Sequence, residues 1–263
     1  MPWLRLRAKR VRDFGESEFA SLGEHSSIIL RATYGPEKIQ QQYLLPTAAR
    51  LSPSREILKS IMDSVDPIRT RPIVGVHIRH GDFRLPSGDT YDARQNRHPA
   101  IPLWWYEHVM SMFKKRFPDV CFLLCFSGEH EIMRQLQARF QIVTPRSLTR
   151  YRPLHAGHVS LGHPVSDLFA LACCTTLIAS PTSSFSHWAA NMLGPQTSCI
   201  LPPPIVSRTR PAQNVVRLYG QVLRNWRAAA ESGTYCSPIA TEDELPAPQP
   251  AQFDWLIDRI RDV

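Results

Sequence analysis

The sequence lacks the cysteine patterns of a metal or redox site. No two of its six cysteines form a CxxC pair, which excludes a zinc ribbon and a thioredoxin-type centre. Most of them lie in apolar runs such as "DVCFLLCF" and "ALACCTTLIA", where cysteine packs as a small hydrophobic residue. We therefore expect reduced, buried thiols in a reducing compartment, and hence a cytoplasmic protein.

Long hydrophobic runs are also missing. No apolar run reaches the roughly 18 residues that a membrane-spanning helix needs. The first residues carry charge without an apolar segment, so we expect no cleaved secretory signal. Basic residues are densest in this first part: Arg5, Arg7, Lys9, Arg10 and Arg12. They predict a solvated helix, with peripheral contact to a membrane surface as the alternative.

The charge balance favours anionic partners. The 263 residues include 31 basic and 23 acidic side chains, a net charge of +8. Nucleic acid, an anionic membrane surface and a phosphate-bearing small molecule all fit this balance. The chain has no zinc-finger spacing and no aromatic RNA-binding signature. We therefore expect a phosphate-bearing small molecule and no nucleic acid.

Apolar strands and amphipathic helices alternate through the middle of the chain. The expected strands are 73–79, 120–126, 141–145, 175–180 and 197–204, and the expected helices are 52–65, 102–117, 127–140, 165–174 and 183–193. Strands that are apolar on both faces and separated by helices are typical of a parallel sheet covered on both sides. The pattern predicts a doubly wound, Rossmann-like α/β domain over residues 71–225.

The two ends of the chain are less regular. Residues 1–70 predict a short N-terminal region with one possible strand in "SSIILRATY" and the helix at 52–65. Residues 226–263 contain the Pro-rich, acidic stretch "SPIATEDELPAPQPAQ", typical of an extended linker, and then a closing amphipathic helix in "FDWLIDRIRDV".

Unusual polar residues follow the strands. Arg79, His80 and Asp82 follow the first strand, Ser127 follows the second, and Ser180, Thr182, Ser183 and Ser184 follow 175–180. Ligands of open α/β sheets bind outside the carboxyl ends of the strands. A Ser-rich turn that enters a helix offers hydroxyls and backbone N–H groups to a phosphate, and an arginine nearby can clamp the same group. Capping of the helix by the serines, and a structural Arg–Asp pair, are the alternatives.

Two segments resemble the α-1,2-fucosyltransferase family and its α-1,6- and protein O-fucosyltransferase relatives. "VGVHIRHGDF" is similar to the family's HxRxGD motif, and "SDLFALACCTTLIASPTSSFSHWAANML" is similar to its Ser-Ser-Phe-Ser-x-Trp block. The resemblance covers residues 71–205. It implies the donor half of a two-Rossmann (GT-B) glycosyltransferase that uses GDP-fucose as donor, inverts the anomeric centre and needs no metal and no further cofactor. The acceptor would be a galactoside-type glycan.

The resemblance also implies roles for particular residues. Arg79 would bind the β-phosphate and neutralise charge as GDP leaves, and Asp82 would act with it. Asp167 would accept hydrogen bonds from guanine. The remaining donor-binding residues would be His77, Ser183, Ser184 and Phe185.

Four departures from the family bear on activity. His80 stands where a second arginine is usual, and His187 where tryptophan is frequent. A Gly-x-x-Gly-Asn-Gln loop that closes over the donor in the family has no counterpart here, and residues 1–70 are too few for a full acceptor domain. A shortened, non-catalytic GDP-sugar-binding module is therefore the alternative to an enzyme.

Metal-dependent chemistry is a weaker hypothesis. His155, His158 and His163 lack the spacing of a helical ligand pair, and a phosphatase built on His77, His80 and Asp82 lacks the further His and Asn motifs of such enzymes.

Overall fold

The computed structural model describes residues 9–11, 28–30, 45–80, 89–92, 100–145, 158–160, 164–180, 183–195, 197–218 and 236–261. The chain forms two compact units, Met1–Arg50 and Leu51–Val263. In the first unit, β1 (Lys9–Val11) pairs in parallel with β2 (Ile28–Leu30), and α3 spans Leu45–Ala49. A strand therefore replaces the predicted helix at residues 9–11, because the segment finds a pairing partner that a local pattern does not reveal.

The second unit contains the sheet and its covering helices. Its strands are β3 (Ile73–Arg79), β4 (Thr90–Asp92), β5 (Cys121–Glu129), β6 (Ile142–Val143), β7 (His158–Ser160), β8 (Thr176–Ile178), β9 (Ser198–Leu201), β10 (Ile205–Ser207), β11 (Val216–Leu218) and β12 (Cys236–Pro238). Its α-helices are α4 (Arg55–Val65), α5 (Leu103–Arg116), α6 (His130–Arg139), α7 (Pro164–Ala172), α8 (Ser184–Trp188) and α10 (Asp254–Arg261). Short helices of other types are η4 (Asp66–Ile68), η5 (Ala189–Leu193, a π-helix), η6 (Pro211–Gln213) and η7 (Glu242–Glu244).

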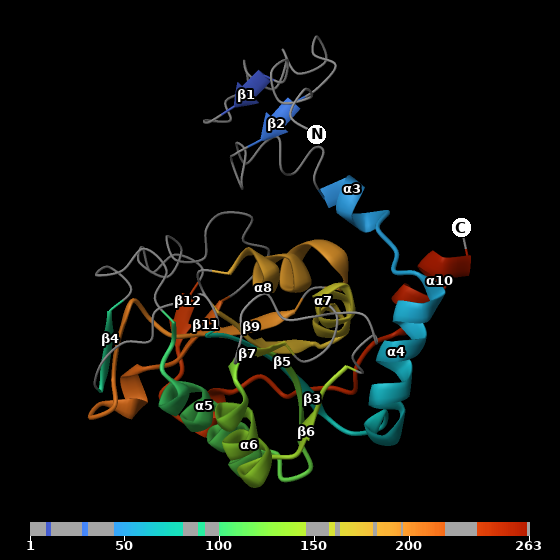
Figure 1. The fold of residues 1–263 in the computed structure, drawn as a ribbon. Helices are drawn as coiled ribbons and strands as arrows, with labels where there is room; N and C mark the ends of the chain where they lie inside the picture. Colours follow the sequence, from blue (N-terminus) through green and yellow to red (C-terminus); the bar gives the residue numbers. More distant parts are fainter. Residues whose placement is uncertain are drawn as a thin grey trace. The chain divides into compact units, whose positions relative to one another are not determined.

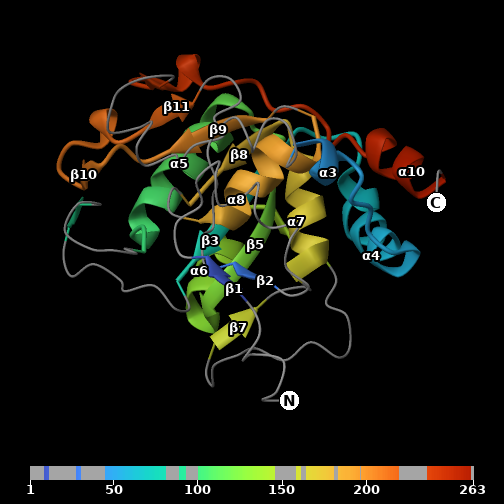
Figure 2. The same cartoon turned by 90° about the horizontal axis from the view of Figure 1, so that it is seen from above.

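The strand order creates a switch point in the main sheet. Seven strands follow one another as β12-β11-β9-β8-β3-β5-β6, and β7 pairs with β5 (Figures 1 and 2). Five are parallel, with β11, β12 and β7 antiparallel to their neighbours. From β3 the chain builds outward through β5 and β6, and then returns to build β8 and β9 on the other side. The predicted α/β class with a mostly parallel sheet is confirmed, and the order is compatible with a Rossmann-like fold whose switch point lies between β3 and β8.

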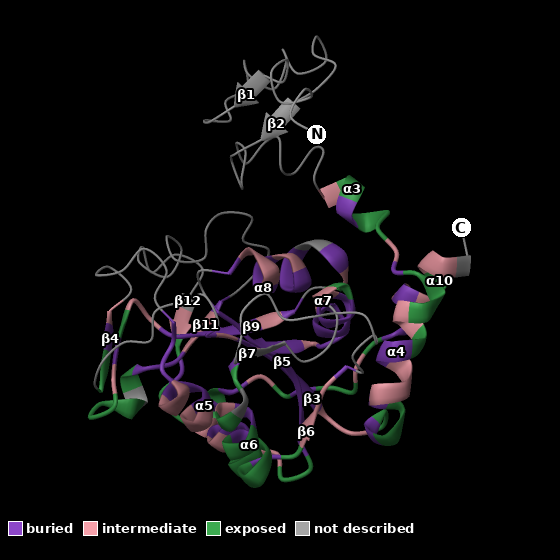
Figure 3. Cartoon of the chain, in the orientation of Figure 1, coloured by how far each residue is buried: buried purple, intermediate pink, exposed green. Residues whose placement is uncertain are grey.

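Alternation along each strand divides the core between the two faces. Val74, Val76 and Ile78 of β3 pack into the hydrophobic core that α5 and α6 cover. Leu177 and Ala179 pack into a second core under α7 and α8. Figure 3 shows the central strands as buried between these two helix layers, as the continuous apolar runs predict.

Local signals place α4 as expected. Ser54 is its N-cap, and the Ser54 side chain accepts a hydrogen bond from the backbone N–H of Ile57. The apolar face of α4 buries Ile61 and Val65, and α4 contacts α7 and α10. The compact unit thus begins at Leu51, whereas the sequence suggested a boundary after residue 70.

Two elements differ from the form that the sequence predicts. β5 continues through Ser127 and Gly128, where a turn was expected, because β7 pairs with Ser127–Glu129. The predicted helix 183–193 starts as α8 and widens into the π-helix η5.

The C-terminal segment packs onto the sheet unit instead of forming a free linker. Leu245, Phe253 and Leu256 are buried. The backbone O of Gln249 accepts from Ile73 N at 3.0 Å, and Gln252 N donates to the carbonyl of Cys173 at 2.8 Å. We call residues 239–256 the C-terminal strap.

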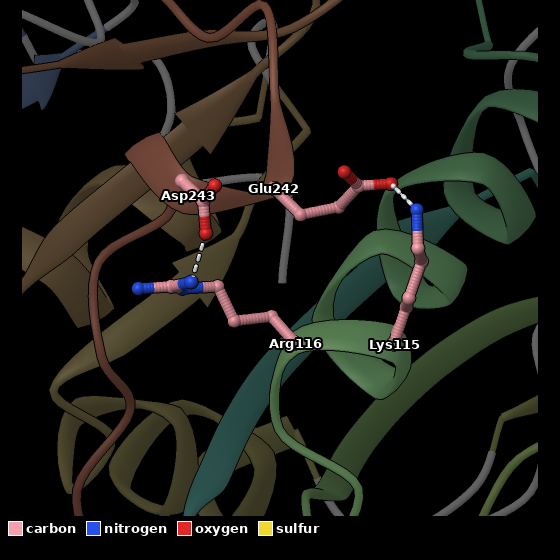
Figure 4. Close-up of polar contacts among 4 residues, drawn as sticks. All are labelled: Lys115, Arg116, Glu242 and Asp243. Atoms are coloured by element: carbon pink, nitrogen blue, oxygen red, sulfur yellow. Dashed lines mark hydrogen bonds and ion pairs between the residues drawn. The ribbon is translucent and has the colours of Figure 1, made fainter.

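Charged side chains attach the strap to α5. Lys115 pairs with Glu242 at 3.0 Å, and Arg116 pairs with Asp243 (Figure 4). Thr241 and Glu244 form a capping box that fixes η7, the short helix to which both acidic residues belong. Among the described residues, no helix is both long enough and apolar enough to cross a membrane.

Candidate functional site

The site expected from the sequence lies at the carboxyl ends of the parallel strands. β3 ends at Arg79 and β8 ends at Ile178, and these neighbouring strands flank the switch point. Ser183, the N-cap residue of α8, follows shortly after β8. The topology therefore brings the Arg79 end of one strand and the Ser183–Ser184 turn of another to the same end of the sheet.

The unusual side chains of the strands share one face. Because side chains alternate, His77 and Arg79 of β3 project to the face opposite Val76 and Ile78, beneath α7 and α8. The register of β5 places Cys125 opposite His77 and Ser127 opposite Arg79. His77 and Arg79 are thus directed away from the apolar core under α5.

His77 is buried and ties β3 to α8. Its Nδ1 lies 2.6 Å from Ser186 Oγ, and its ring lies 5.0 Å from the ring of Phe185. Burial, and to a smaller extent the charge of Arg79, lowers the pKa of His77 to about 3. The imidazole is therefore neutral at physiological pH, and it can hold the α8 turn in place without adding charge to the site.

Arg79 stands at the end of β3 and is partly exposed. Its effect on the pKa of His77 shows that the guanidinium charge acts on the buried part of the site. The other predicted catalytic residue, Asp82, lies outside the described residues, as does Thr182.

Asp167 lies in the first turn of α7, against the middle of β5. The Cys125 thiol donates to the backbone carbonyl of Asp167 across 3.6 Å. The carboxyl oxygen Oδ1 is buried and has no hydrogen-bond partner among the described residues. Burial raises the pKa of Asp167 well above its usual range, although a hydrogen bond from Cys125 opposes that shift. A buried acceptor without a partner costs about 1–3 kcal/mol, a cost that a hydrogen-bond donor from outside the described residues would remove.

Ser183 behaves differently from an ordinary capping residue. It occupies the N-cap position of α8, but its side chain makes no capping hydrogen bond. Its Oγ is buried and, within the described chain, unpartnered. Its backbone N–H is already bonded to the carbonyl of Ser180 at 3.0 Å. The alternative that the hydroxyl of Ser183 caps α8 is therefore not supported by any hydrogen bond among the described residues. Ser184 and Phe185 follow Ser183 and are both partly exposed.

His80 holds the end of β3 to the segment before α5. Its Nε2 lies 2.7 Å from the carbonyl of Ile101, and its backbone N–H donates to Ser127 O at 2.7 Å. Because a carbonyl only accepts, Nε2 carries the hydrogen. Burial lowers the pKa of His80, so it is a neutral tie where a second arginine was expected by resemblance.

Sequence reasoning missed two hydroxyls of this site, those of Tyr106 and Ser180. Tyr106 Oη lies 2.9 Å from Ser180 Oγ, and both lie within hydrogen-bond distance of the His77 carbonyl. Tyr106 lies in an apolar helix, so the sequence predicts that it belongs to the core. Only the tertiary structure reveals that its hydroxyl contacts Ser180 and the His77 carbonyl. Ser180 was recognised as polar, but its partners were not predictable.

No metal cluster is found in the part of the chain that the structure describes. No three His, Cys, Asp or Glu side chains gather there as an ion would require. His155, His163 and Asp82, three of the alternative metal ligands, lie outside that part. The described cysteines Cys121, Cys125, Cys173, Cys174 and Cys199 are free and buried, and burial raises the pKa of each. These thiols are therefore poor nucleophiles and poor metal ligands.

Comparison of the chain with protein-family models, with curated proteins and with solved structures finds no match. The fold and the local geometry are thus the observations from which a function can be inferred. A mostly parallel α/β sheet has Arg79 and the neutral His77 on β3 beside the switch point. The neighbouring helices α7 and α8 carry a carboxyl and a hydroxyl that are buried without partners in the described part of the chain.

Proposed function

We propose that this protein binds GDP-fucose at the switch point and transfers fucose to a galactoside-type glycan, with inversion and without a metal ion. The observation that carries the proposal is that Asp167 Oδ1 on α7 and Ser183 Oγ at the start of α8 are both buried without a hydrogen-bond partner among the described residues, on two helices that contact each other. The identity of the donor, GDP-fucose, is inferred from the fucosyltransferase-like motifs. The GT-B architecture is part of this proposal.

Binding of guanine would account for the unpartnered carboxyl oxygen of Asp167. The base presents two donors side by side, N1–H and the 2-amino group, and an ionised carboxylate offers two acceptors in matching geometry. Adenine and uracil present a donor beside an acceptor on that edge, which would leave one carboxylate oxygen unpaired. A site built to satisfy both oxygens therefore prefers guanine.

Phosphate chemistry explains the other side of the site. Arg79 would hold the β-phosphate, with Ser183 and Ser184 as hydroxyl donors, and Phe185 and His77 would support the turn. In the reaction an oxygen of the acceptor attacks C1 of fucose, the bond between C1 and the β-phosphate oxygen breaks, and GDP leaves with the bonding electrons. The acceptor's hydroxyl proton passes to a base or to water. The guanidinium of Arg79 stabilises the negative charge that grows on the leaving phosphate.

A non-catalytic GDP-sugar-binding module is the second candidate. It is favoured by the lack of the Gly-x-x-Gly-Asn-Gln loop and by the single Rossmann-like sheet in the described residues. Binding and turnover are therefore tested separately. Incubation with GDP-fucose and a galactoside should yield fucosylated product and GDP in equal amounts if the chain is an enzyme, and neither product if it only binds.

A base-exchange experiment tests the binding proposal. Asp167→Asn replaces one acceptor with an N–H donor, so the variant should lose GDP affinity and gain affinity for xanthosine diphosphate, whose C2 oxygen accepts. We expect a loss of about 10- to 100-fold for GDP, equivalent to one charge-assisted hydrogen bond. Calorimetry with GDP, ADP, UDP and xanthosine diphosphate measures the exchange, with EDTA added to one series. Equal affinities of the parent for GDP, ADP and UDP would remove guanine recognition, and loss of binding in EDTA would remove the metal-free site.

A further inference from the structure

The hydrogen-bond ladder between β3 and β8 stops before the end of β3. Its last pair is Val76 with Ile178, whereas β3 stays paired with β5 as far as Arg79. The next residue of the β8 segment, Ala179, donates its N–H to Ile200 on the other side. β3 and β8 therefore part at the switch point, and the carbonyl of His77 needs a donor other than the β8 backbone.

Two side-chain hydroxyls provide that donor. Ser180 Oγ lies 2.9 Å from the carbonyl of His77, Tyr106 Oη lies 3.2 Å from it, and the two hydroxyl oxygens are 2.9 Å apart. Each hydroxyl has a single hydrogen, so only two of these three contacts can be donated at once. The shorter distances favour a chain from Tyr106 to Ser180 to His77. Burial raises the pKa of Tyr106, so its hydroxyl keeps its proton.

The same residues carry the turn that enters α8. Ser180 O accepts from the backbone N–H of Ser183, and Ser180 N lies 3.3 Å from Ser186 Oγ, which also bonds His77 Nδ1. Tyr106, Ser180, His77 and Ser186 are all buried. The network thus joins α5, β3 and the β8–α8 turn at one point, with Arg79 two residues beyond His77 and Ser183 three residues beyond Ser180.

We propose that Tyr106 and Ser180 are positioning residues, whose hydroxyls fix the spacing between Arg79 and the Ser183–Ser184 turn and so set the geometry of the diphosphate site. The inference rests on the proposed function for the identity of the ligand. A phosphate held from both sides is sensitive to this spacing, because displacements of about 1 Å weaken charge-assisted hydrogen bonds and misplace reacting groups. A nucleotide without a β-phosphate would not sense it.

Tyr106→Phe and Ser180→Ala each remove one hydroxyl and little volume. We expect each variant to bind GDP about threefold to tenfold more weakly than the parent, while GMP affinity changes by less than about twofold. The double variant should lose little more than either single variant, because both hydroxyls serve one network. Calorimetric titration with GDP and GMP measures the ratio.

Thr197→Val is the matched control. Thr197 Oγ1 is also a buried hydroxyl bonded to a backbone carbonyl, that of Cys174 at 2.9 Å, but it lies before β9 at the opposite end of the sheet. It should lower the melting temperature by an amount similar to Ser180→Ala and leave the ratio of GDP to GMP affinity unchanged. A merely structural role for Tyr106 and Ser180 predicts that they behave like this control.

Hydrogen exchange without ligand separates this inference from the proposed function. Tyr106→Phe should speed exchange at the amides of His80, Ser183 and Ser186, while amides at the start of β5 stay protected. If the parent binds no GDP, the proposed function fails, and the exchange pattern alone decides whether the hydroxyls set the spacing. Unchanged exchange at these amides together with an unchanged GDP to GMP ratio would overturn the positioning role.

Discussion

The two ends of the main sheet differ in how their polar groups are satisfied. At the amino ends of the parallel strands, the C-terminal strap bonds Ile73 and Cys173, and the N–H of Gln249 donates to Thr175 Oγ1. At the carboxyl ends, Asp167 Oδ1 and Ser183 Oγ are buried without partners among the described residues. Each such group costs about 1–3 kcal/mol. The strap also contains one, the buried indole Nε1 of Trp255, so the two ends differ in the kind of group that is left without a described partner.

This difference indicates which end serves stability and which serves binding. An unpaired buried group is tolerated where a ligand completes it, and both groups lie on elements beside the switch point. The amino end is closed by chain-to-chain hydrogen bonds and apolar side chains, and the unpartnered atom of its strap, Trp255 Nε1, belongs to an indole ring and not to a carboxyl or hydroxyl group. Substitutions at the two ends should therefore change different properties of the protein.

Shortening an apolar side chain of the strap should produce the largest loss of stability. Leu256 is fully buried on α10. Leu256→Ala should lower the free energy of unfolding by about 2–5 kcal/mol, the usual cost of removing a buried leucine side chain. Urea denaturation followed by circular dichroism measures the loss.

The control is Leu51→Ala, since Leu51 is 45% exposed and should change little. GDP affinity of the Leu256→Ala variant, measured well below its unfolding transition, should match that of the parent. A strap variant that unfolds like the parent but loses GDP would reverse the roles assigned to the two ends.

Acid should destabilise the carboxyl end through its buried histidine. The pKa of His77 is lowered to about 3 in the folded chain, against 6.5 in a solvated histidine. The unfolded chain binds this proton first, so folding stability falls as the pH drops from about 6.5 toward 3, by at most about 1.4 kcal/mol per pH unit. His187, whose pKa burial lowers to about 4, adds a similar slope over a narrower window.

His77→Asn isolates the first contribution, because the asparagine amide can replace Nδ1 in the bond to Ser186. Denaturation from pH 7 to pH 4 should show a shallower fall in the variant than in the parent. An identical pH dependence in both would mean that His77 is not buried as a neutral group.

Asp167 should act with the opposite sign and a smaller effect. Burial raises its pKa, so the folded chain retains a proton that the unfolded chain has lost, and stability falls as the pH rises above the unfolded value. Asp167→Asn removes this slope and should raise the free energy of unfolding by about 1–2 kcal/mol at neutral pH, with a smaller gain in acid. Thermal unfolding at several pH values measures the gain.

GDP binding should change the protonation state of Asp167. Guanine needs both carboxylate oxygens as acceptors, so GDP binding should release a proton and strengthen as the pH rises until free Asp167 is ionised. Calorimetry in two buffers of different ionisation enthalpy detects the released proton. A stabilising Asp167→Asn change with undiminished GDP affinity would separate this carboxyl from the site.

Local patterns predicted the parts of the molecule that depend on local chemistry. The apolar run 73–79 forms β3 with those limits, and Ser54 caps α4 as its spacing indicates. The order of elements also placed Arg79 and Ser183 at one end of the sheet. Their chemical states were not predictable, because the missing cap bond of Ser183 and the orphaned oxygen of Asp167 depend on packing between distant segments.

Long-range contacts account for what the sequence missed. Ser127 and Gly128 are common turn residues, but pairing with β7 keeps them in β5. The strap has the composition of a linker, with many prolines and acidic residues. Its apolar side chains Leu245 and Phe253 are nevertheless buried. Its acidic residues Glu242 and Asp243 pair with Lys115 and Arg116, which lie in the last turn of α5. Only the tertiary structure shows that these charges meet.

Neutralising that charged contact should give the smallest effect. Glu242 and Asp243 pair with Lys115 and Arg116 at the protein surface, where water and salt screen the attraction (Figure 4). The double variant Glu242→Gln, Asp243→Asn should lower the unfolding midpoint by roughly a tenth of the Leu256→Ala shift. The difference should vanish in about 1 M NaCl, where the Debye length is near 3 Å. Lys115 lowers the pKa of Glu242, so this contribution is present above the ordinary carboxyl range and is lost as the pH falls and Glu242 is protonated. Asp63→Asn, which breaks the exposed Lys59–Asp63 pair on α4, is the matched control and should behave alike. A loss as large as that of Leu256→Ala, or one that persists in high salt, would mean that charge rather than apolar burial holds the strap to the amino end of the sheet.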